Sequence, residues 1–242
     1  PDGVAAGSNE FGAVLYLTDR SGGLSRINTL ASGASWTVAG NFAQNVSLGE
    51  PGEIFRWLIS YDRPIYAACP SGFYGYDSDR YSRNILRDLI YQRTANNGKE
   101  STIWHSQIWI PTARGLYSYS PDAMALRDTG PLVHINARAD ENSRPFGMPT
   151  AIAADQSWLY VLMDNGTDTR LFAGREGQGG EPAMVWHTLN TWTGKRPYTL
   201  AHVTGMTSPS RLLAFQQSGT ASVAWIALPK ADNPLQDPAQ TY

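Results

Sequence analysis

The side chains that could do chemistry in this sequence are few and widely separated. Two acids and one histidine, Asp62, His105 and Asp155, each stand at the end of a short apolar segment and before a more strongly apolar one. If these short segments are the first strands of successive repeats, the three side chains could converge at one mouth of a central channel. Two carboxylates at a defined separation could then supply the general acid and base of a glycoside hydrolase.

A simpler interpretation of the two aspartates is favoured here. Asp side chains accept hydrogen bonds from backbone N–H groups in tight turns, and both stand where a turn between two strands is expected. The Asp-box pattern of sialidases, with Ser, Asp, Gly and Trp at fixed offsets, does not occur in the sequence. We therefore assign no catalytic residue, and the sequence favours a protein without enzymatic activity.

Metal and cofactor sites are not indicated either. A single cysteine, Cys69, cannot build a multi-cysteine site. The loop that starts at Asp164 has Arg175 at its twelfth position, where an EF-hand needs Glu. The glycines of 174–180 are not followed by the Lys-Ser/Thr of a phosphate loop. The histidines form neither an HxH nor an HExxH pattern: His105, His134, His187 and His202. We expect no metal and no cofactor.

Composition limits the class of protein and its partners. Of the 242 residues, 42% are hydrophobic and only 17% are charged, which is typical of a compact globular chain. The formal net charge of -2 gives no electrostatic case for nucleic acid or an acidic membrane surface. No apolar run is long enough to span a bilayer. The amino end lacks an initiating Met and a signal sequence, so we expect a mature product or an excised piece.

Five segments of the chain share one plan. Each has a short strand of small residues, a turn, a strongly apolar strand, a second turn, and a third strand rich in aromatic or aliphatic residues. Equivalent points on the second strands are spaced by 51, 43, 51 and 53 residues: Val14, Ile65, Ile108, Leu159 and Leu212. The first strand of the fifth repeat is expected at 203–208. This period is typical of propeller blades.

A fourth strand is predicted at the outer edge of each of the first four repeats. The expected ranges are 34–40, 84–90, 124–130 and 183–189. The second of these also fits one or two helical turns, because Ile85, Leu86, Leu89 and Ile90 have helical spacing. We prefer a strand there, because of its position after the third strand of its repeat.

The fold class predicted is all-β, a β-propeller with about five visible four-stranded blades, and a six- or seven-bladed parent ring is an open alternative. Large aromatics on the strands should fill the wedges between blades: Trp57, Trp104, Trp109, Trp158, Trp186 and Trp225. A β-sandwich or a solenoid ranks lower, since neither requires this period. The propeller domain is expected over 1–228, followed by an extended, Pro-containing tail over 229–242.

The fourth repeat, PTAIAADQSWLYVLMDNGTDTRLFAGR over 149–175, resembles propeller repeats of the NHL and YWTD type. The resemblance implies a propeller fold and no particular activity. Diverged repeats with long loops between blades are also similar to the propeller domains of phage tail and fibre proteins. That resemblance implies a virion or extracellular location.

Partner-binding residues are expected on loops and exposed rings. Arg outnumbers Lys by 16 to 3, which suits contacts with other protein chains. The long segments 136–149 and 177–182 are the predicted partner surfaces. The main hypothesis is a non-enzymatic structural or protein-interaction module of a larger assembly, with a virion tail or fibre as the favoured setting. The alternatives are the hydrolase and a lectin-like propeller whose exposed rings stack on glycans: Trp192, Tyr198, Tyr74 and Tyr76.

Overall fold

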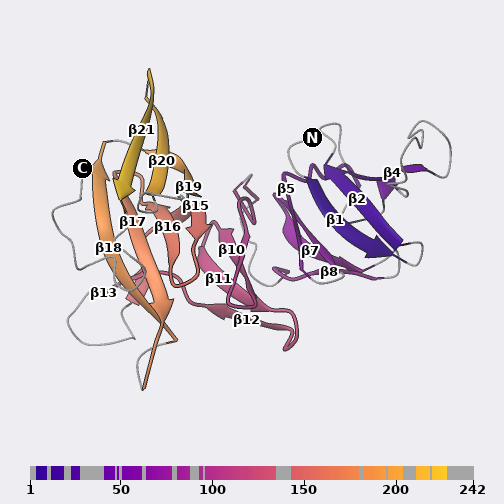
Figure 1. The fold of residues 1–242 in the computed structure, drawn as a ribbon, viewed down its shortest axis with the longest axis horizontal. Helices are drawn as coiled ribbons and strands as arrows, with labels where there is room; N and C mark the ends of the chain where they lie inside the picture. Colours follow the sequence, from indigo (N-terminus) through magenta and orange to yellow (C-terminus); the bar gives the residue numbers. More distant parts are fainter. Residues whose placement is uncertain are drawn as a thin grey trace. The chain divides into compact units, whose positions relative to one another are not determined.

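The structure is a computed structural model of an all-β chain, and its residues form two compact units, 1–101 and 102–242 (Figure 1). Each unit is described by itself. The residues described are 4–9, 12–18, 23–27, 41–46, 48, 51–61, 64–77, 81–87, 93–94, 96–134, 143–179, 183–194, 196–203, 211–218 and 220–227. No helix long and apolar enough to cross a membrane occurs among them.

The first unit contains two four-stranded antiparallel sheets, each with its strands in chain order. The first sheet consists of β1 (Val4–Asn9), β2 (Gly12–Thr18), β3 (Leu24–Ile27) and β4 (Phe42–Val46). The second consists of β5 (Trp57–Ser60), β6 (Ile65–Cys69), β7 (Gly72–Asp77) and β8 (Tyr81–Asn84). β6 is buried along its whole length, because neighbouring strands and side chains cover both of its faces.

One apolar cluster joins the two sheets of the first unit. Tyr16 of β2 meets Tyr76 of β7 edge to face, with ring centroids 6.0 Å apart. Phe55 meets Tyr74 in the same way at 6.2 Å. Cys69 is also in this cluster. Burial raises the pKa of its thiol to about 11, so the only cysteine of the chain is an apolar core residue.

The second unit contains a four-stranded sheet, a two-stranded hairpin, a second four-stranded sheet and a three-stranded sheet. The first sheet is β9 (Thr102–Trp104), β10 (Gln107–Thr112), β11 (Gly115–Ser120) and β12 (Ala125–Asp128). The hairpin is β13 (Leu132–His134) and β14 (Ser143–Pro145). The next sheet is β15 (Met148–Ala154), β16 (Leu159–Asp164), β17 (Asp168–Glu176) and β18 (Met184–Thr193). The last is β19 (Pro197–Val203), β20 (Arg211–Ser218) and β21 (Thr220–Ala227).

Successive sheets of the second unit pack mainly through their first and second strands. β15 contacts β9 and β10 on one side and β19 on the other. An aromatic cluster that includes Trp104, Trp109 and Phe172 fills the first of these interfaces. A second cluster, which includes Trp158 and Leu212, fills the next. Four-stranded meanders packed in this way are β-propeller-like blades.

Indole N–H groups connect neighbouring elements within each unit. Trp104 Nε1 donates to Asp155 O at 2.9 Å, and Trp186 Nε1 donates to Thr129 O at 2.7 Å. In the first unit Trp57 Nε1 donates to Ser101 O at 3.0 Å. The apolar body of each ring packs while its polar edge is satisfied, as buried Trp requires. The expected role of Trp104, Trp109 and Trp158 between blades is confirmed, whereas the side chain of Trp225 lies outside the described residues.

The strand predictions are correct for the third and fourth repeats and need correction in the second. The predicted edge strands at 124–130 and 183–189 correspond to β12 and β18. The strand predicted at 84–90 is wrong over 85–87, because β8 ends at Asn84 and a turn follows there, and 88–90 lie outside the described residues. Asn84 Oδ1 accepts the N–H of Leu86 at 3.1 Å, and this local bond ends the strand.

Two further strand predictions fall on residues outside the described part of the chain. The predicted edge strand at 34–40 lies there, and the strand that pairs with β3 is β4. In the fifth repeat the first strand is β19, which ends at Val203, and 204–208 lie outside the described residues. The tail predicted at 229–242 also lies outside them.

Candidate functional site

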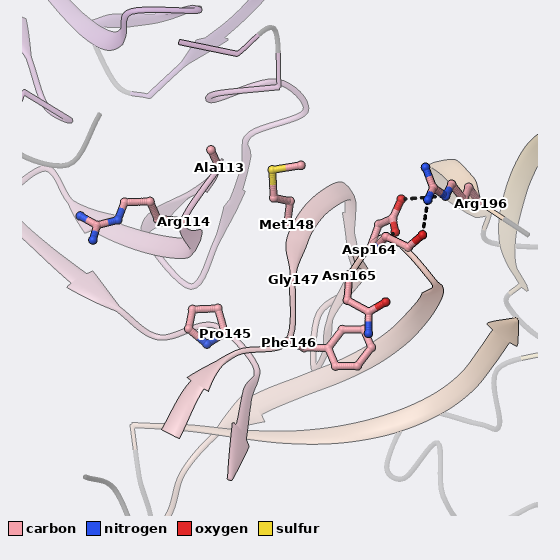
Figure 2. Close-up of a pocket in the computed structure, with 10 residues that line it drawn as sticks. Ala113, Arg114, Pro145, Phe146, Gly147, Met148, Asp164, Asn165 and Arg196 are labelled. Atoms are coloured by element: carbon pink, nitrogen blue, oxygen red, sulfur yellow. Dashed lines mark hydrogen bonds and ion pairs between the residues drawn. The ribbon is translucent and has the colours of Figure 1, made fainter. Parts of the chain in front are cut away.

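A pocket of about 470 Å³ opens in the second unit, at the ends of strands from three successive sheets (Figure 2). The β10–β11 turn, the link from β14 to β15, the β16–β17 turn and the residue before β19 all contribute to it. The residues that line it are Ala113, Arg114, Pro145, Phe146, Gly147, Met148, Asp164, Asn165, Gly166 and Arg196.

The base of the pocket is built where β15 begins. Gly147 lies so close to the β16–β17 turn that a Cβ atom on it would be 2.3 Å from Asp164 O. A residue with a side chain therefore cannot occupy position 147 without moving the backbone of the turn. Gly147 fixes the distance between the two segments that form the base.

Phe146 is the apolar centre of the pocket. Its side chain is only 8% exposed and meets Phe172 edge to face, with ring centroids 5.7 Å apart. The guanidinium of Arg170 lies 4.2 Å from the centroid of the Phe146 ring. Met148, which is 37% exposed, gives the pocket an accessible and flexible apolar wall.

The polar groups of the β16–β17 turn are bonded mainly to one another. Asp164 Oδ1 accepts the N–H of Gly166 at 2.7 Å, and Asn165 Oδ1 accepts the N–H groups of Thr167 and Asp168 at 3.0 and 2.8 Å. Arg196 donates to Gly166 O, and its Nε lies 3.6 Å from Asp164 Oδ2. Figure 2 shows this ion pair at one side of the pocket, with the Arg114 guanidinium directed away from Met148 at the other.

The channel-mouth candidate Asp155 caps a turn. Its Oδ1 accepts the N–H groups of Ser157 and Trp158 at 2.8 and 2.7 Å, and its Oδ2 accepts the Tyr160 hydroxyl at 2.8 Å. Burial, followed by the neighbouring carboxylate, raises the pKa of Tyr160 far above its usual range. The carboxylate of Asp155 is therefore engaged within its own turn.

His105 lies beside this turn and joins two sheets of the second unit. Its Nε2 donates to Gln156 O at 2.9 Å, and its Nδ1 donates to Glu176 Oε1 at 3.0 Å. Its ring stacks on Trp104, with centroids 3.8 Å apart. Burial lowers the pKa of His105, but the bonds to Gln156 and Glu176 raise it by more, so the pKa is raised. Both partners are acceptors, so the arrangement favours the doubly protonated ring.

The backbone at His105 is unusual. His105 and Ser106 have φ angles of 48° and 59°, and they connect β9 to β10 as a two-residue turn. Turns of this type normally use Asn and Gly, because most side chains disfavour the left-handed region. The bonds and the ring stack of His105 hold this conformation in place.

The proposed channel-mouth group is therefore only partly assembled. The structure brings His105 next to the turn of Asp155, but each side chain has a structural partner there. Asp62 lies outside the described residues. Among the described residues, no group of three or more His, Cys, Asp or Glu side chains could hold a metal ion.

The four rings expected to stack on glycans differ in exposure. Tyr74 and Tyr76 are 9% and 5% exposed and belong to the core of the first unit, so the expectation that they are exposed is wrong. Trp192 is partly buried against the cluster that includes Trp158. Tyr198 is 45% exposed. Tyr74 and Tyr76 lie on β7 and pack in the cluster that joins its sheet to the neighbouring one, and a period-two pattern does not show which face of a strand is covered.

The predicted partner surface at 136–149 includes four residues that line the pocket, 145–148. Of the other predicted surface, 177–182, the structure describes 177–179, where Gly177 N–H donates to Ala183 O at 3.2 Å. Sequence reasoning missed Arg114 and Arg196. Both are ordinary turn or linker arginines in the sequence, and only the packing of three sheets brings them to one pocket.

The strand order and the packing of consecutive sheets define a β-propeller-like protein. No family model matches the chain, and no curated protein matches it. Among solved structures, it is similar to a chain of the S. cerevisiae complex of Dbp5 with Nup159, Gle1, IP6 and ADP, at 10% identity and a TM-score of 0.49. That match covers 93% of this chain and 57% of the other.

Two further solved structures are similar to the chain. The N-terminal domain of Nup159 has 10% identity and a TM-score of 0.49, over 90% of this chain and 56% of that domain. The extracellular domain of a one-component system protein from B. thetaiotaomicron has 12% identity and a TM-score of 0.39, over 92% of this chain and 32% of that chain. The chain thus spans little more than half, or about a third, of these structures. The assignment of blades rests on the strand order and packing of the chain itself.

Proposed function

We propose that this chain is a protein-interaction module whose partner binds at the pocket around Phe146. The observation that carries the proposal is that segments from three successive sheets form this pocket. Its volume of about 470 Å³ lies within the range of about 300–1,000 Å³ that is common for ligand sites. Connections between strands often carry function when a rigid scaffold positions them.

The geometry supports binding to a partner segment in two ways. Gly147 and the internal bonds of the β16–β17 turn fix the base, so little ordering entropy is lost when a partner binds. Met148 offers an exposed and adaptable apolar contact. A preformed site with one flexible wall suits a short peptide segment.

A non-enzymatic role is part of the proposal. The carboxylate of Asp155 accepts three hydrogen bonds in its own turn, and such bonds favour its structural role over acid–base chemistry. His105 is likewise held between Gln156 and Glu176. These contacts weigh against the hydrolase alternative.

The wider setting of the module rests on the repeat pattern alone. We propose five blades over 1–228, a tail over 229–242, and a place in a larger assembly such as a virion tail or fibre. The spacing of the second strands and the diverged loops support this setting. An electron-microscopy reconstruction of the native particle tests it, because a ring with another number of blades, or a free monomer, would contradict it.

Glycan binding is a second candidate, supported by the 45% exposure of Tyr198. An exposed ring could stack on a sugar, with Trp192 as the other candidate contact. A glycan array probed with the parent chain and with Tyr198→Ala tests this candidate. Binding lost in the variant supports it, and an array without signal rejects it.

Selection of short random peptides on the intact chain tests the main proposal. We expect the selected peptides to slow amide hydrogen exchange at 113–114, 145–148 and 164–166. The β11–β12 turn at 121–124 serves as the internal control, since it is exposed and does not line the pocket. Peptides that protect other segments, or a selection that yields no binder, would contradict the proposal.

A further inference from the structure

We infer that the occupant of the pocket is a partner segment that carries an acidic side chain next to an apolar one. This inference rests on the proposed function, since it specifies the partner class for the same pocket. Two properties of the described residues support it: an apolar base and an excess of cationic groups around that base.

The apolar half of the site is small and continuous. Pro145, Phe146 and Met148 follow one another closely in the chain, and Ala113 lies on the turn opposite them (Figure 2). Phe146 is held in place by Phe172, whereas Met148 remains accessible. Such a surface can take one aliphatic or aromatic side chain.

The charges around this base are mainly positive. Arg114 and Arg196 line the pocket, and Arg170 stacks on the Phe146 ring that forms its centre. Asp164 is the only carboxylate among the lining residues. It already accepts a hydrogen bond from Gly166 and lies within ion-pair distance of Arg196. Arg170 and Arg196 thus stand beside one carboxylate among the described residues, an imbalance that favours an anionic ligand.

Arg170 strengthens the argument, because its Nε is buried and has no hydrogen-bond partner. A buried donor without a partner is costly and calls for an explanation. Here the Phe146 ring stabilises the cation, and no carboxylate neutralises it within the described residues. Its charge therefore remains available to attract an acidic group to the pocket.

The hydrogen-bonding groups point to the same ligand chemistry. Asn165 uses its Oδ1 for two backbone N–H groups of its own turn, so its amide N–H₂ is the part left for a ligand. Arginine likewise offers donors only. A carboxylate accepts from both groups, whereas a Lys or Arg side chain would find few acceptors there.

The test uses three labelled peptides in a Gly/Ser frame, which contain Leu-Asp, Leu-Asn or Ser-Asp at one position. Binding to the intact chain is measured by fluorescence anisotropy. We expect the Leu-Asp peptide to bind about tenfold more tightly than each of the others, since a charged hydrogen bond and a buried aliphatic side chain each contribute about this factor. We also expect its affinity to fall as salt is added.

Charge-reversal variants test whether the Leu-Asp peptide binds at the pocket. Arg196→Glu should weaken binding of the Leu-Asp peptide about tenfold or more, through charge reversal at the site. Arg127→Glu on the exposed edge strand β12 is the matched control, since it makes the same change of charge outside the pocket. Equal losses in the two variants would show that only net charge matters, and would overturn the inference.

The results of the peptide experiments distinguish failure of this inference about the ligand from failure of the proposed function. If Leu-Asp and Leu-Asn peptides bind equally and both protect 145–148 from exchange, the ligand class is wrong and the binding pocket stands. If neither peptide binds at the pocket, and selected peptides also fail to protect it, both proposals fail. Tighter binding of heparin than of the Leu-Asp peptide would identify a general polyanion site and overturn the inference.

Discussion

Single residues set the geometry of the pocket, and Gly147 does so most strictly. Nothing in the sequence distinguishes it from the other 22 glycines of the chain. Its constraint comes from the backbone of a turn that lies 17 residues further along, at Asp164. A contact of this kind follows only from the tertiary structure.

Gly147→Ala should destabilise the second unit by about 2–4 kcal/mol, because the new methyl group overpacks against backbone that cannot move aside. Gly166→Ala is the matched control. It has open space around its Cβ position but a φ of 96°, so we expect a smaller cost of about 1 kcal/mol from backbone strain. Urea unfolding of the two variants measures the difference. Equal stabilities would mean that Gly147 does not lie against the turn.

Glu100 is a second single residue that should affect stability, because its burial makes the free energy of unfolding depend on pH. Its side chain is 13% exposed, and burial raises its pKa from 4.5 to about 7, an effect that Lys99 only partly offsets. The folded state therefore holds this proton more tightly than the unfolded state does. The contribution of Glu100 to stability is therefore greatest below pH 4.5 and is lost as the pH rises through about 7.

Glu100→Gln should remove this loss. The variant should gain stability relative to the parent between pH 4.5 and 7, by up to about 3 kcal/mol, since each pKa unit corresponds to about 1.4 kcal/mol. Asp122→Asn, on an exposed turn, controls for the change in net charge. Unfolding by urea across this pH range gives the comparison. A constant difference between Glu100→Gln and the parent would contradict the prediction.

At the scale of elements, His105 connects the β9–β10 turn to the β15–β16 turn and to β17. Its folded pKa is raised, so its contribution to stability is complete below its unfolded value of 6.5 and is lost as the pH rises through the folded value. The acceptors that face it are Gln156 O and the Glu176 carboxylate. Its side chain is 37% exposed, so solvent screens the effect and we expect less than about 1 kcal/mol.

His105→Asn should abolish this pH dependence while retaining the turn, because Asn tolerates the left-handed conformation of this position. As the pH rises above 6.5, the parent should lose more stability than the variant, because the effect of Glu100 is common to both. Glu176→Gln should remove part of the dependence and keep the bond to Gln156. Parallel pH profiles for the parent and His105→Asn would show that His105 is not coupled to the neighbouring sheet.

The Trp186 side chain is another connection between elements. It packs on Gly174 of the neighbouring strand, where a Cβ atom would lie 2.5 Å from the indole ring, and it donates to Thr129 O. Trp186→Phe should cost about 1–3 kcal/mol, because Thr129 O loses a partner and the smaller ring leaves space. Thermal unfolding followed by circular dichroism measures this cost. A variant as stable as the parent would show that the bond does not hold the two segments together.

At the scale of the whole molecule, the period of the sequence predicted the second strand of each three- or four-stranded sheet. The five spaced points, from Val14 to Leu212, lie on β2, β6, β10, β16 and β20, which are the second strands of their sheets. Alternating apolar residues identify strands because each sheet buries at least one face. The strand predicted at 84–90 failed because Leu86 is buried in a turn, and the apolar pattern does not distinguish the two cases.

Much less of the candidate site could be predicted from the sequence. The loop at 136–149 was singled out for its length, and its last residues do line the pocket. Arg114, Arg170 and Arg196 come from three separate segments and gave no signal, since only the packing of the sheets brings them together. Tyr74 and Tyr76 gave a misleading signal, because an aromatic strand residue serves a core as well as a ligand site.

Photo-crosslinking of a selected peptide shows whether the chain binds a partner segment at the pocket built from three successive sheets. A photoreactive phenylalanine analogue replaces Met148, which is 37% exposed in the pocket wall, or Met124, which is 65% exposed on a turn outside it. We expect the peptide to crosslink at position 148 and to leave position 124 unlabelled. Crosslinking at 124 with none at 148 would contradict it.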